Sequence, residues 1–203
     1  MDEIRMQDYL KQLIKENISP IMKAAGFKKS SNNFYKDLGD IGWCFGVQSS
    51  SWNTIDDVEF TFNTAIFVPA LYKILIEEKI PMFPKEYQGI YRRSISKLLN
   101  EDEKWYRLRT ISEYNGLKSI VEMHIQEFIL PRLKEITDIN ALLEGITQSK
   151  YDENPICIAI LQKMIGKQIE SEKILKQLYL QNESLKYRDF VLEISSKINI
   201  EIL

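Results

Sequence analysis

The stretches IGWCFGVQS (residues 41–49) and VEFTFNTAIFV (residues 58–68) decide the fold class of this chain. Side chains of one face stand at every second position in both stretches, and all but Thr64 are apolar: Ile41, Trp43, Phe45 and Val47 in the first, and Val58, Phe60, Phe62, Thr64, Ile66 and Val68 in the second. A period of two with one apolar face is typical of antiparallel strands that are covered on one side. The polar residues 49–57 between them fit a hairpin loop. We therefore predict two neighbouring strands of one sheet.

Other elements follow outward from this pair. Apolar residues recur at helical spacing over residues 2–25, and Gly26 is a good helix stop because glycine tolerates the left-handed conformation. The short aromatic stretch NNFYKD (residues 32–37) predicts a third strand. Residues 90–99 and 105–110 predict a fourth and a fifth strand, which pair with each other across the acidic residues 101–103.

The remainder of the chain has helical periodicity. A short helix is expected at residues 70–78, and later helices are expected at residues 112–129, 138–146, 155–165, 168–181 and 184–198. The predicted fold class is therefore α+β: an antiparallel sheet of four to five strands packed on an N-terminal helix, followed by a C-terminal helical bundle. We divide the chain into a sheet domain at residues 1–135 and a helical extension at residues 136–203 that packs on it.

Charge and composition narrow the classes of partner and compartment. The 27 basic and 29 acidic residues give a net charge of −2, which lacks the basic excess that generic binding to nucleic acid requires. No apolar run approaches the roughly 20 residues that a membrane span needs. The charged start MDEIRMQDYL does not resemble a signal peptide, and the two cysteines, Cys44 and Cys157, are too few for a disulfide framework. We expect a cytoplasmic protein without a membrane partner.

The motifs of common enzymes are missing from the sequence. His124 is the single histidine and lies among apolar residues, so we interpret it as a half-buried structural residue and expect no metal site with paired histidines. Cys44 and Cys157 are interpreted as buried, unreactive thiols. Glycine-rich phosphate loops are absent, and the acidic residues 101–103 fit a solvated turn. We predict no catalytic residues, no metal ligands and no cofactor.

One group of polar and aromatic residues stands out as a candidate binding site. Its members are Gln48, Asn63, Arg92, Arg93, Trp105 and Arg107. The planar guanidinium group of arginine can bind carboxylates and phosphates through two hydrogen bonds, and aromatic rings offer stacking surfaces. Pairing of the fourth and fifth strands would place these groups together. The alternative is an ordinary outer strand whose charges discourage edge-to-edge pairing.

Several segments, taken in order, resemble a bacterial family. They are AAGFKK (24–29), NNFYKD (32–37), GVQSS (46–50), FTFNTAIFVP (60–69), YRRSI (91–95), KWYRL (104–108) and FILPRL (128–133). Over roughly residues 5–135 the chain resembles the bacterial domain-of-unknown-function family 4304. The resemblance implies an α+β fold around an antiparallel sheet, and it implies no reaction.

Two classes of function remain open from the sequence. The first is a non-catalytic module that binds another protein, as an immunity or regulatory protein does. The second is an enzyme or small-ligand binder, in which Arg92, Arg107 and an acidic residue converge on an anionic substrate in a cleft between sheet and helices. A third interpretation gives the C-terminal helices a role in homodimerisation.

Overall fold

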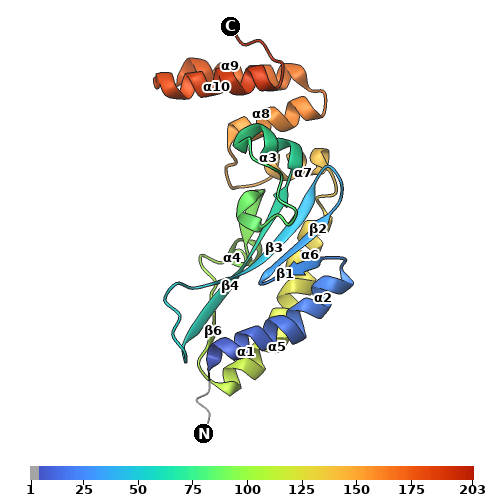
Figure 1. Ribbon diagram of the computed structural model, residues 1–203, viewed down its shortest axis with the longest axis vertical. Coiled ribbons are helices and arrows are strands. Elements are labelled where there is room, and N and C mark those ends of the chain that lie inside the picture. The colour runs from blue at the N-terminus through green and yellow to red at the C-terminus, as the bar shows by residue number, and fades with distance from the viewer. Residues whose placement is uncertain (1–4) are drawn as a thin grey trace. The chain divides into compact units, whose positions relative to one another are not determined.

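The computed structural model describes residues 5–203, and the first residues of the helix expected at 2–25 lie outside this range. The chain has the predicted α+β architecture, with N-terminal helices, an antiparallel sheet and C-terminal helices (Figure 1). It divides into two compact units. The first contains the chain up to Phe67 together with Met82–Glu135, and the second contains Val68–Pro81 together with Ile136–Leu203. Each unit is described separately below.

The first unit is built on an antiparallel sheet. Its strands among the described residues are β1 (Lys28–Ser30), β2 (Asn33–Asp37), β3 (Gly42–Ser49), β4 (Val58–Phe67), β5 (Ile90–Ser94) and β6 (Tyr106–Leu108). They follow the order β1-β2-β3-β4-β5, and β6 pairs with β4 beside β5. The two decisive stretches are neighbours as predicted, because β3 pairs with β4 from Gly42↔Phe67 to Ser49↔Phe60.

The edge beyond β4 differs from the expectation. Strand β5 ends at Ser94, and residues Ile95–Leu99 form helix α4 instead of continuing the strand. The reason is a helix cap, because the Ser94 side chain accepts a hydrogen bond from the backbone N–H of Lys97. Strands β5 and β6 therefore do not pair with each other across residues 101–103. Both pair with β4, β5 along Asn63–Ile66 and β6 along Val58–Phe60.

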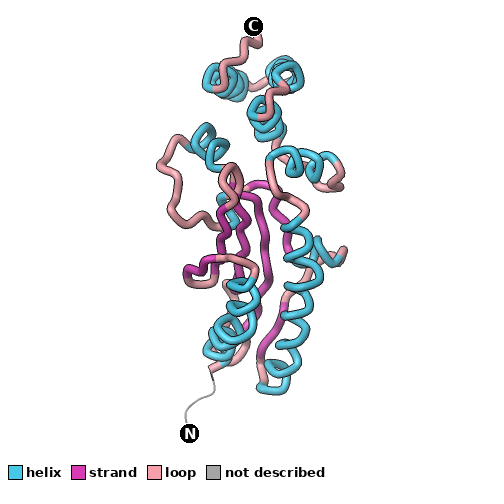
Figure 2. The backbone as a smooth tube through the Cα atoms, turned by 90° about the vertical axis from the view of Figure 1, so that its right-hand side faces the viewer, coloured by secondary structure: helices cyan, strands magenta, loops and turns pink. Residues whose placement is uncertain are grey.

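Helices cover one face of this sheet (Figure 2). The N-terminal helical segment comprises α1 (Met6–Leu13), a π-helical turn η1 (Ile14–Ile18) and α2 (Ser19–Ala24). The second helical segment comprises α5 (Ile111–His124), a π-helical turn η3 (Ile125–Ile129) and α6 (Leu130–Lys134). The predicted stop Gly26 has a φ of +89°. Beneath the helices lies an aromatic core of fully buried rings: Phe34, Phe45, Phe60 and Phe62. Phe45 contacts both Phe34 and Phe62, which links three strands.

Both π-helical turns share one local pattern, isoleucine-x-glutamate-x-isoleucine-x-proline. It reads IKENISP at residues 14–20 and IQEFILP at residues 125–131. In each turn the residue before proline donates its N–H five residues back, Ser19 to Ile14 and Leu130 to Ile125. A proline inside an α-helix lacks an N–H and its ring collides with the carbonyl four residues earlier. The widened turn relieves that collision and lets each helix continue past its proline.

The second face of the sheet is covered in part by the segment Met82–Gly89, which contains the short 3₁₀ helix η2 (Glu86–Gln88). The Cys44 thiol lies 3.8 Å from the carbonyl oxygen of Pro84, and the side chain of Glu86 lies over Gly46. A Cβ atom at position 46 would stand 2.9 Å from Cγ of Glu86, so glycine is needed there for close packing. Further along this face stand the exposed Gln48 and the half-buried Glu59 and Asn63.

The second unit consists of helices at the predicted places. They are α3 (Pro69–Ile76), α7 (Ile139–Thr147), α8 (Pro155–Met164), α9 (Gln168–Gln181) and α10 (Leu185–Lys197). Helices α8 and α9 pack on each other across the turn at Gly166, which has a φ of +81°. The ammonium of Lys197 joins α10 to α3 through Glu77 at 2.6 Å. In the part of the chain that the structure describes, no helix has the length and apolar character of a membrane span.

Candidate functional site

Gln48 and Asn63 lie together on the exposed part of the second sheet face. They stand on adjacent strands, and the Asn63 amide donates a 2.7 Å hydrogen bond to Oε1 of Gln48. Gln48 is exposed and Asn63 is half-buried. This amide pair can offer further donors and acceptors to a partner, because each amide has more hydrogen-bonding capacity than one bond uses.

Arg92 lies on the same face but belongs to a structural ion pair. Its Nη2 atom is 2.6 Å from Oε2 of Glu86, and its Nε atom is 2.8 Å from the same oxygen. The Glu86 side chain is only 10% exposed, whereas that of Arg92 is 50% exposed. Arg92 therefore neutralises a buried carboxylate that holds the covering segment on the sheet.

Arg107 lies at the other end of the same edge. It pairs with Asp57 and Glu59, and Arg109 adds a 3.3 Å contact to Asp57. Because Arg107 is opposite Glu59 and Arg92 is beside Ala65, about 20 Å of strand β4 separates the two guanidinium groups. They do not converge on one pocket, and each already has a carboxylate partner.

Arg93 lies on the opposite sheet face from the amide pair, and Trp105 stands just before β6. Arg93 is opposite Thr64, which places its side chain on the helix-covered face, where it is 6% exposed and stacks 4.1 Å from the centre of the Tyr91 ring. Trp105 precedes β6, and its indole N–H donates to Glu103 at 2.6 Å. Of the residues singled out from the sequence, the structure thus places Gln48, Asn63, Arg92 and Arg107 on one face and separates Arg93 from them.

A more prominent feature is Trp52, which the sequence analysis did not single out. Its side chain is 89% exposed in the β3–β4 loop, next to the 46% exposed Ile55. The loop itself is well fixed. Asn53 exchanges two hydrogen bonds with the backbone of Glu59, at 2.7 and 2.9 Å, and the backbone N–H of Met6 donates to the carbonyl of Ile55 at 2.8 Å. A loop held by hydrogen bonds therefore presents a large apolar ring to solvent.

A cavity of about 360 Å³ lies beside this loop. Apolar side chains from helix α1, the turn η1 and strand β4 line it on one side: Leu10, Ile14 and Val58. Polar side chains line the rest: Gln7, Lys11, Asn32, Ser49, Ser50 and Asn53. Among the residues that the structure describes, the side chains of Asn32 and Ser49 make no hydrogen bond, so both can bond to a bound molecule.

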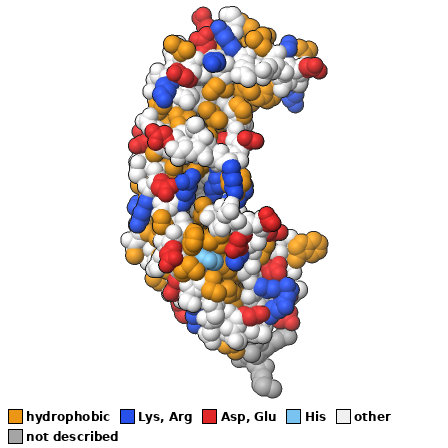
Figure 3. Space-filling view, turned by 180° about the vertical axis from the view of Figure 1, so that it is seen from behind, with side chains coloured by type: hydrophobic (Ala, Val, Ile, Leu, Met, Phe, Trp, Pro, Cys, Tyr) orange, Lys and Arg blue, Asp and Glu red, His pale blue; other side chains and the backbone are white. Residues whose placement is uncertain are grey.

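The titratable groups of the unit are largely structural. The only histidine, His124, is 6% exposed, and hydrophobic side chains surround the part of it that reaches the surface (Figure 3). Burial lowers its pKa, and the nearby Lys104 ammonium lowers it further. Burial raises the pKa of the Cys44 thiol to about 12. Within residues 5–203, no group of three or more histidine, cysteine or carboxylate side chains is placed to hold a metal ion.

Comparison with known families agrees with this architecture. The family model described as a domain of unknown function, DUF4304, matches residues 18–135, which is more than half of the chain. The chain belongs to the DUF4304 family. No curated protein and no solved structure matches it.

The DUF4304 match contains the Trp52 loop and the polar sheet face. It begins at residue 18, so four residues of the cavity wall lie outside it: Gln7, Leu10, Lys11 and Ile14. It ends at Glu135, the last residue of the first unit. The loop that presents Trp52 therefore belongs to the DUF4304 domain itself. An indole within a mostly polar connection was the sequence signal that could have identified it.

Proposed function

We propose that this protein is a protein-binding module whose DUF4304 domain docks a partner on the Trp52 loop and the adjoining cavity. The observation that supports the proposal most strongly is the exposure of Trp52 on a loop fixed by hydrogen bonds. A single exposed apolar side chain is common on protein surfaces, and it is the combination of Trp52 with a hydrogen-bonded loop and an adjoining cavity that points to a partner. Tryptophan is also enriched among the residues that dominate binding free energy at protein interfaces.

The fixed loop lowers the cost of binding. A flexible loop would have to be ordered on association, and each immobilised side chain would oppose the gain from contact. Here the two bonds of Asn53 to Glu59, the bond of Ile55 to Met6 and the bond of Gln7 to the carbonyl of Thr54 order the loop beforehand. The free energy released when Trp52 is buried is then available for affinity.

The cavity indicates what the partner presents. Its apolar wall, Leu10, Ile14 and Val58, suits one aliphatic or aromatic side chain. The unpaired side chains of Asn32 and Ser49 suit the main-chain groups that flank such a side chain. Lys11 contributes little net charge, because it pairs with Asp8 at 2.8 Å. The expected partner is therefore a protein with an exposed segment whose apolar side chain enters the cavity.

The experiment begins with a photo-crosslinking amino acid at position 52 of the full-length protein, in the cells that make it. A second chain with the same amino acid at Met82, which is 96% exposed, is the matched control. The crosslinked partner is then purified, and its affinity is measured for wild type, Trp52→Ala, Met82→Ala and Ser49→Trp. The last variant fills the cavity from its exposed rim.

We expect Trp52→Ala and Ser49→Trp each to weaken binding at least tenfold while Met82→Ala leaves it unchanged. Equal affinity of all four proteins for the captured partner would contradict the proposal, and so would equal crosslinking from positions 52 and 82. The melting temperature of each variant shows whether a loss of affinity arises from a loss of folding.

An immunity or regulatory role is one form of this function, because such a protein acts by occupying a surface of its target. The alternative of an enzyme for an anionic substrate receives no comparable support. It needs Arg92 and Arg107 to converge, and each of them is paired with a carboxylate at a different end of β4.

A further inference from the structure

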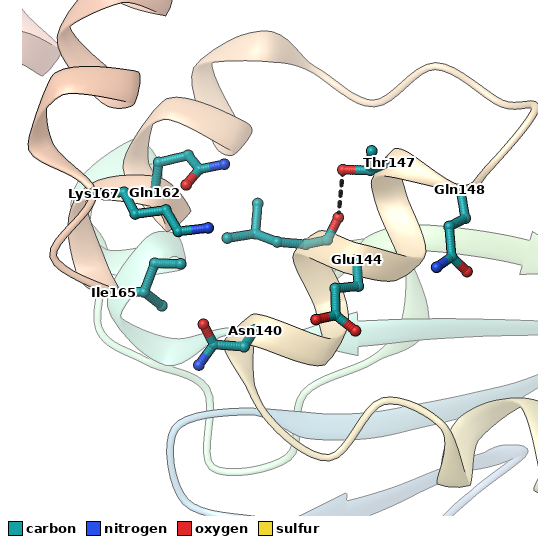
Figure 4. A pocket seen from close by; sticks show the side chains of 8 residues that line it. Asn140, Glu144, Thr147, Gln148, Gln162, Ile165 and Lys167 are labelled. Atoms are coloured by element: carbon teal, nitrogen blue, oxygen red, sulfur yellow. Dashed lines mark hydrogen bonds between the residues drawn. The ribbon is translucent and has the colours of Figure 1, made fainter.

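A second, separate cavity lies within the helical unit (Figure 4). Its volume is about 200 Å³, which suits a molecule of a few heavy atoms better than a nucleotide or a drug-sized ligand. One wall is a stripe of helix α7, with Asn140, Leu143, Glu144 and Thr147 at helical spacing. The other wall is the end of α8 and the turn to α9, with Gln162, Ile165 and Lys167.

Several polar side chains around this cavity lack partners in the described part of the chain, although the Thr147 hydroxyl donates to the carbonyl of Leu143. Among residues 5–203, the side chains of Asn140, Glu144, Gln162 and Lys167 take part in no hydrogen bond or ion pair. The Oε1 atom of Gln162 is inaccessible to solvent and still has no donor. A buried acceptor without a donor costs roughly 1–3 kcal/mol, so it is normally satisfied by protein, water or ligand.

The charges on the two walls are opposite but do not meet. Glu144 extends from α7, and Lys167 extends from the turn before α9. They line one cavity without forming an ion pair within 4.0 Å, although both side chains are long enough to move. A molecule that has a positive group near Glu144 and a negative group near Lys167 would complete both interactions.

We propose that the cavity between α7 and the α8–α9 turn binds a small zwitterion, a free α-amino acid with an aliphatic side chain. The ammonium group is held by Glu144. The carboxylate is held by Lys167 and by the amide N–H₂ of Asn140. The aliphatic side chain lies on Leu143 and Ile165, which supply the apolar part of the wall. This assignment is independent of the protein-binding surface, which lies in the other unit.

The test is titration of the full-length protein with leucine, valine, isoleucine and methionine, followed by calorimetry and by the backbone and side-chain amide signals in NMR. Two related compounds separate the charges of leucine: 3-methylbutylamine has only the ammonium, and 4-methylpentanoate has only the carboxylate. We expect at least one of the amino acids to bind with a dissociation constant of about 1 mM or lower, and both related compounds to bind at least tenfold more weakly.

Variants locate the site. Glu144→Gln and Lys167→Met each remove one charge from the cavity and are expected to weaken binding about tenfold or more. Glu183→Gln and Lys173→Met remove exposed charges of the same types from elsewhere in the unit and are the matched controls. All four positions are exposed, so the variants should fold, and their melting temperatures verify this.

Three results would overturn the assignment. The first is the absence of saturable binding for all four amino acids. The second is binding that Glu144→Gln and Lys167→Met leave unchanged, because the ligand would then lie elsewhere. The third is equally tight binding of the amine or the acid alone, because one charge would then suffice. Shifts of the Gln162 side-chain amide signals on addition of leucine, together with loss of affinity in both charge variants, would support it.

Discussion

The phenol hydroxyl of Tyr106 lies 2.6 Å from Nδ1 of His124, which joins the last strand of the sheet to helix α5. Both groups are buried, and burial raises the pKa of Tyr106 while it lowers that of His124. The pair is therefore held in its neutral state. An ion on either ring would lie in the aromatic core, beside Phe60, Phe62 and Phe128.

The His124 pair predicts a loss of stability on acidification. Because the folded-state pKa of His124 is below its unfolded value, the unfolded chain takes up a proton first as the pH falls below about 6.5. His124→Gln should therefore lose less stability than wild type between pH 7.5 and pH 5.5. The slopes of the free energy of unfolding against pH should differ between the two proteins by at most about 1.4 kcal/mol per pH unit. Urea unfolding at several pH values measures it, and equal slopes for the two proteins would contradict the burial argument.

The two arginines on the sheet edge predict unequal effects on stability. Arg92→Met leaves the nearly buried carboxylate of Glu86 without a partner, so we expect a loss of about 1–2 kcal/mol. Arg107→Met removes contacts with Asp57 and Glu59, which are both about one-third exposed, so solvent screens these pairs and the loss should be clearly smaller than that of Arg92→Met. Chemical denaturation of both variants gives the comparison. The same loss in both would show that the burial of Glu86 is unimportant.

Alanine substitutions at two glycines are expected to change the stability of the protein in opposite directions. Gly42→Ala would place a Cβ atom against the Tyr35 ring, so we expect a loss of about 1–3 kcal/mol. Gly116 is an exposed residue in helix α5 with open space around it, and Gly116→Ala should stabilise the protein by about 0.5–1 kcal/mol. Melting temperatures measure both effects. The penalty at position 42 should shrink in a Tyr35→Leu background, since that change removes the ring.

We expect both cysteines of the native protein to react slowly with thiol reagents. Both Cys44 and Cys157 are free and buried, and burial raises their pKa values to about 12 and about 11. At pH 8 very little thiolate is present, and the reagent has no access to it. We expect modification of native protein to follow local or global unfolding, and to become fast in guanidinium chloride. Rapid labelling of either cysteine in native protein would contradict this.

Much of the fold could be predicted from periodicity. The alternation in β3 and β4 and the spacing of the helices are long patterns, and long patterns are the most reliable ones. The errors lie where short-range signals decide the structure. Strand β1 has three exposed residues and no apolar face. The end of β5 depends on one serine cap, and Ile95, Leu98 and Leu99 after it have the spacing of a helix.

The candidate site was harder to predict, because its properties depend on three-dimensional neighbours. The sequence shows arginines but not their partners, so Arg92 and Arg107 could not be recognised as members of separate ion pairs. It shows that Trp52 is in a loop, but not that the loop is fixed by Asn53 or that a cavity lies beside it. The lack of hydrogen-bond partners around Gln162 also appears only in the structure.

The two prolines that follow π-helical turns have a consequence for how the family can vary. A π-turn contains one residue more than an α-helical turn needs, and the widened turn accommodates it without rotating the helix beyond it by the ~100° that one α-helical residue adds. While proline occupies position 20 or 131, the additional residue is tolerated because it resolves a collision. Relatives that lose such a proline are free to lose one residue as well. Proline loss and single-residue shortening of the helix should therefore occur together.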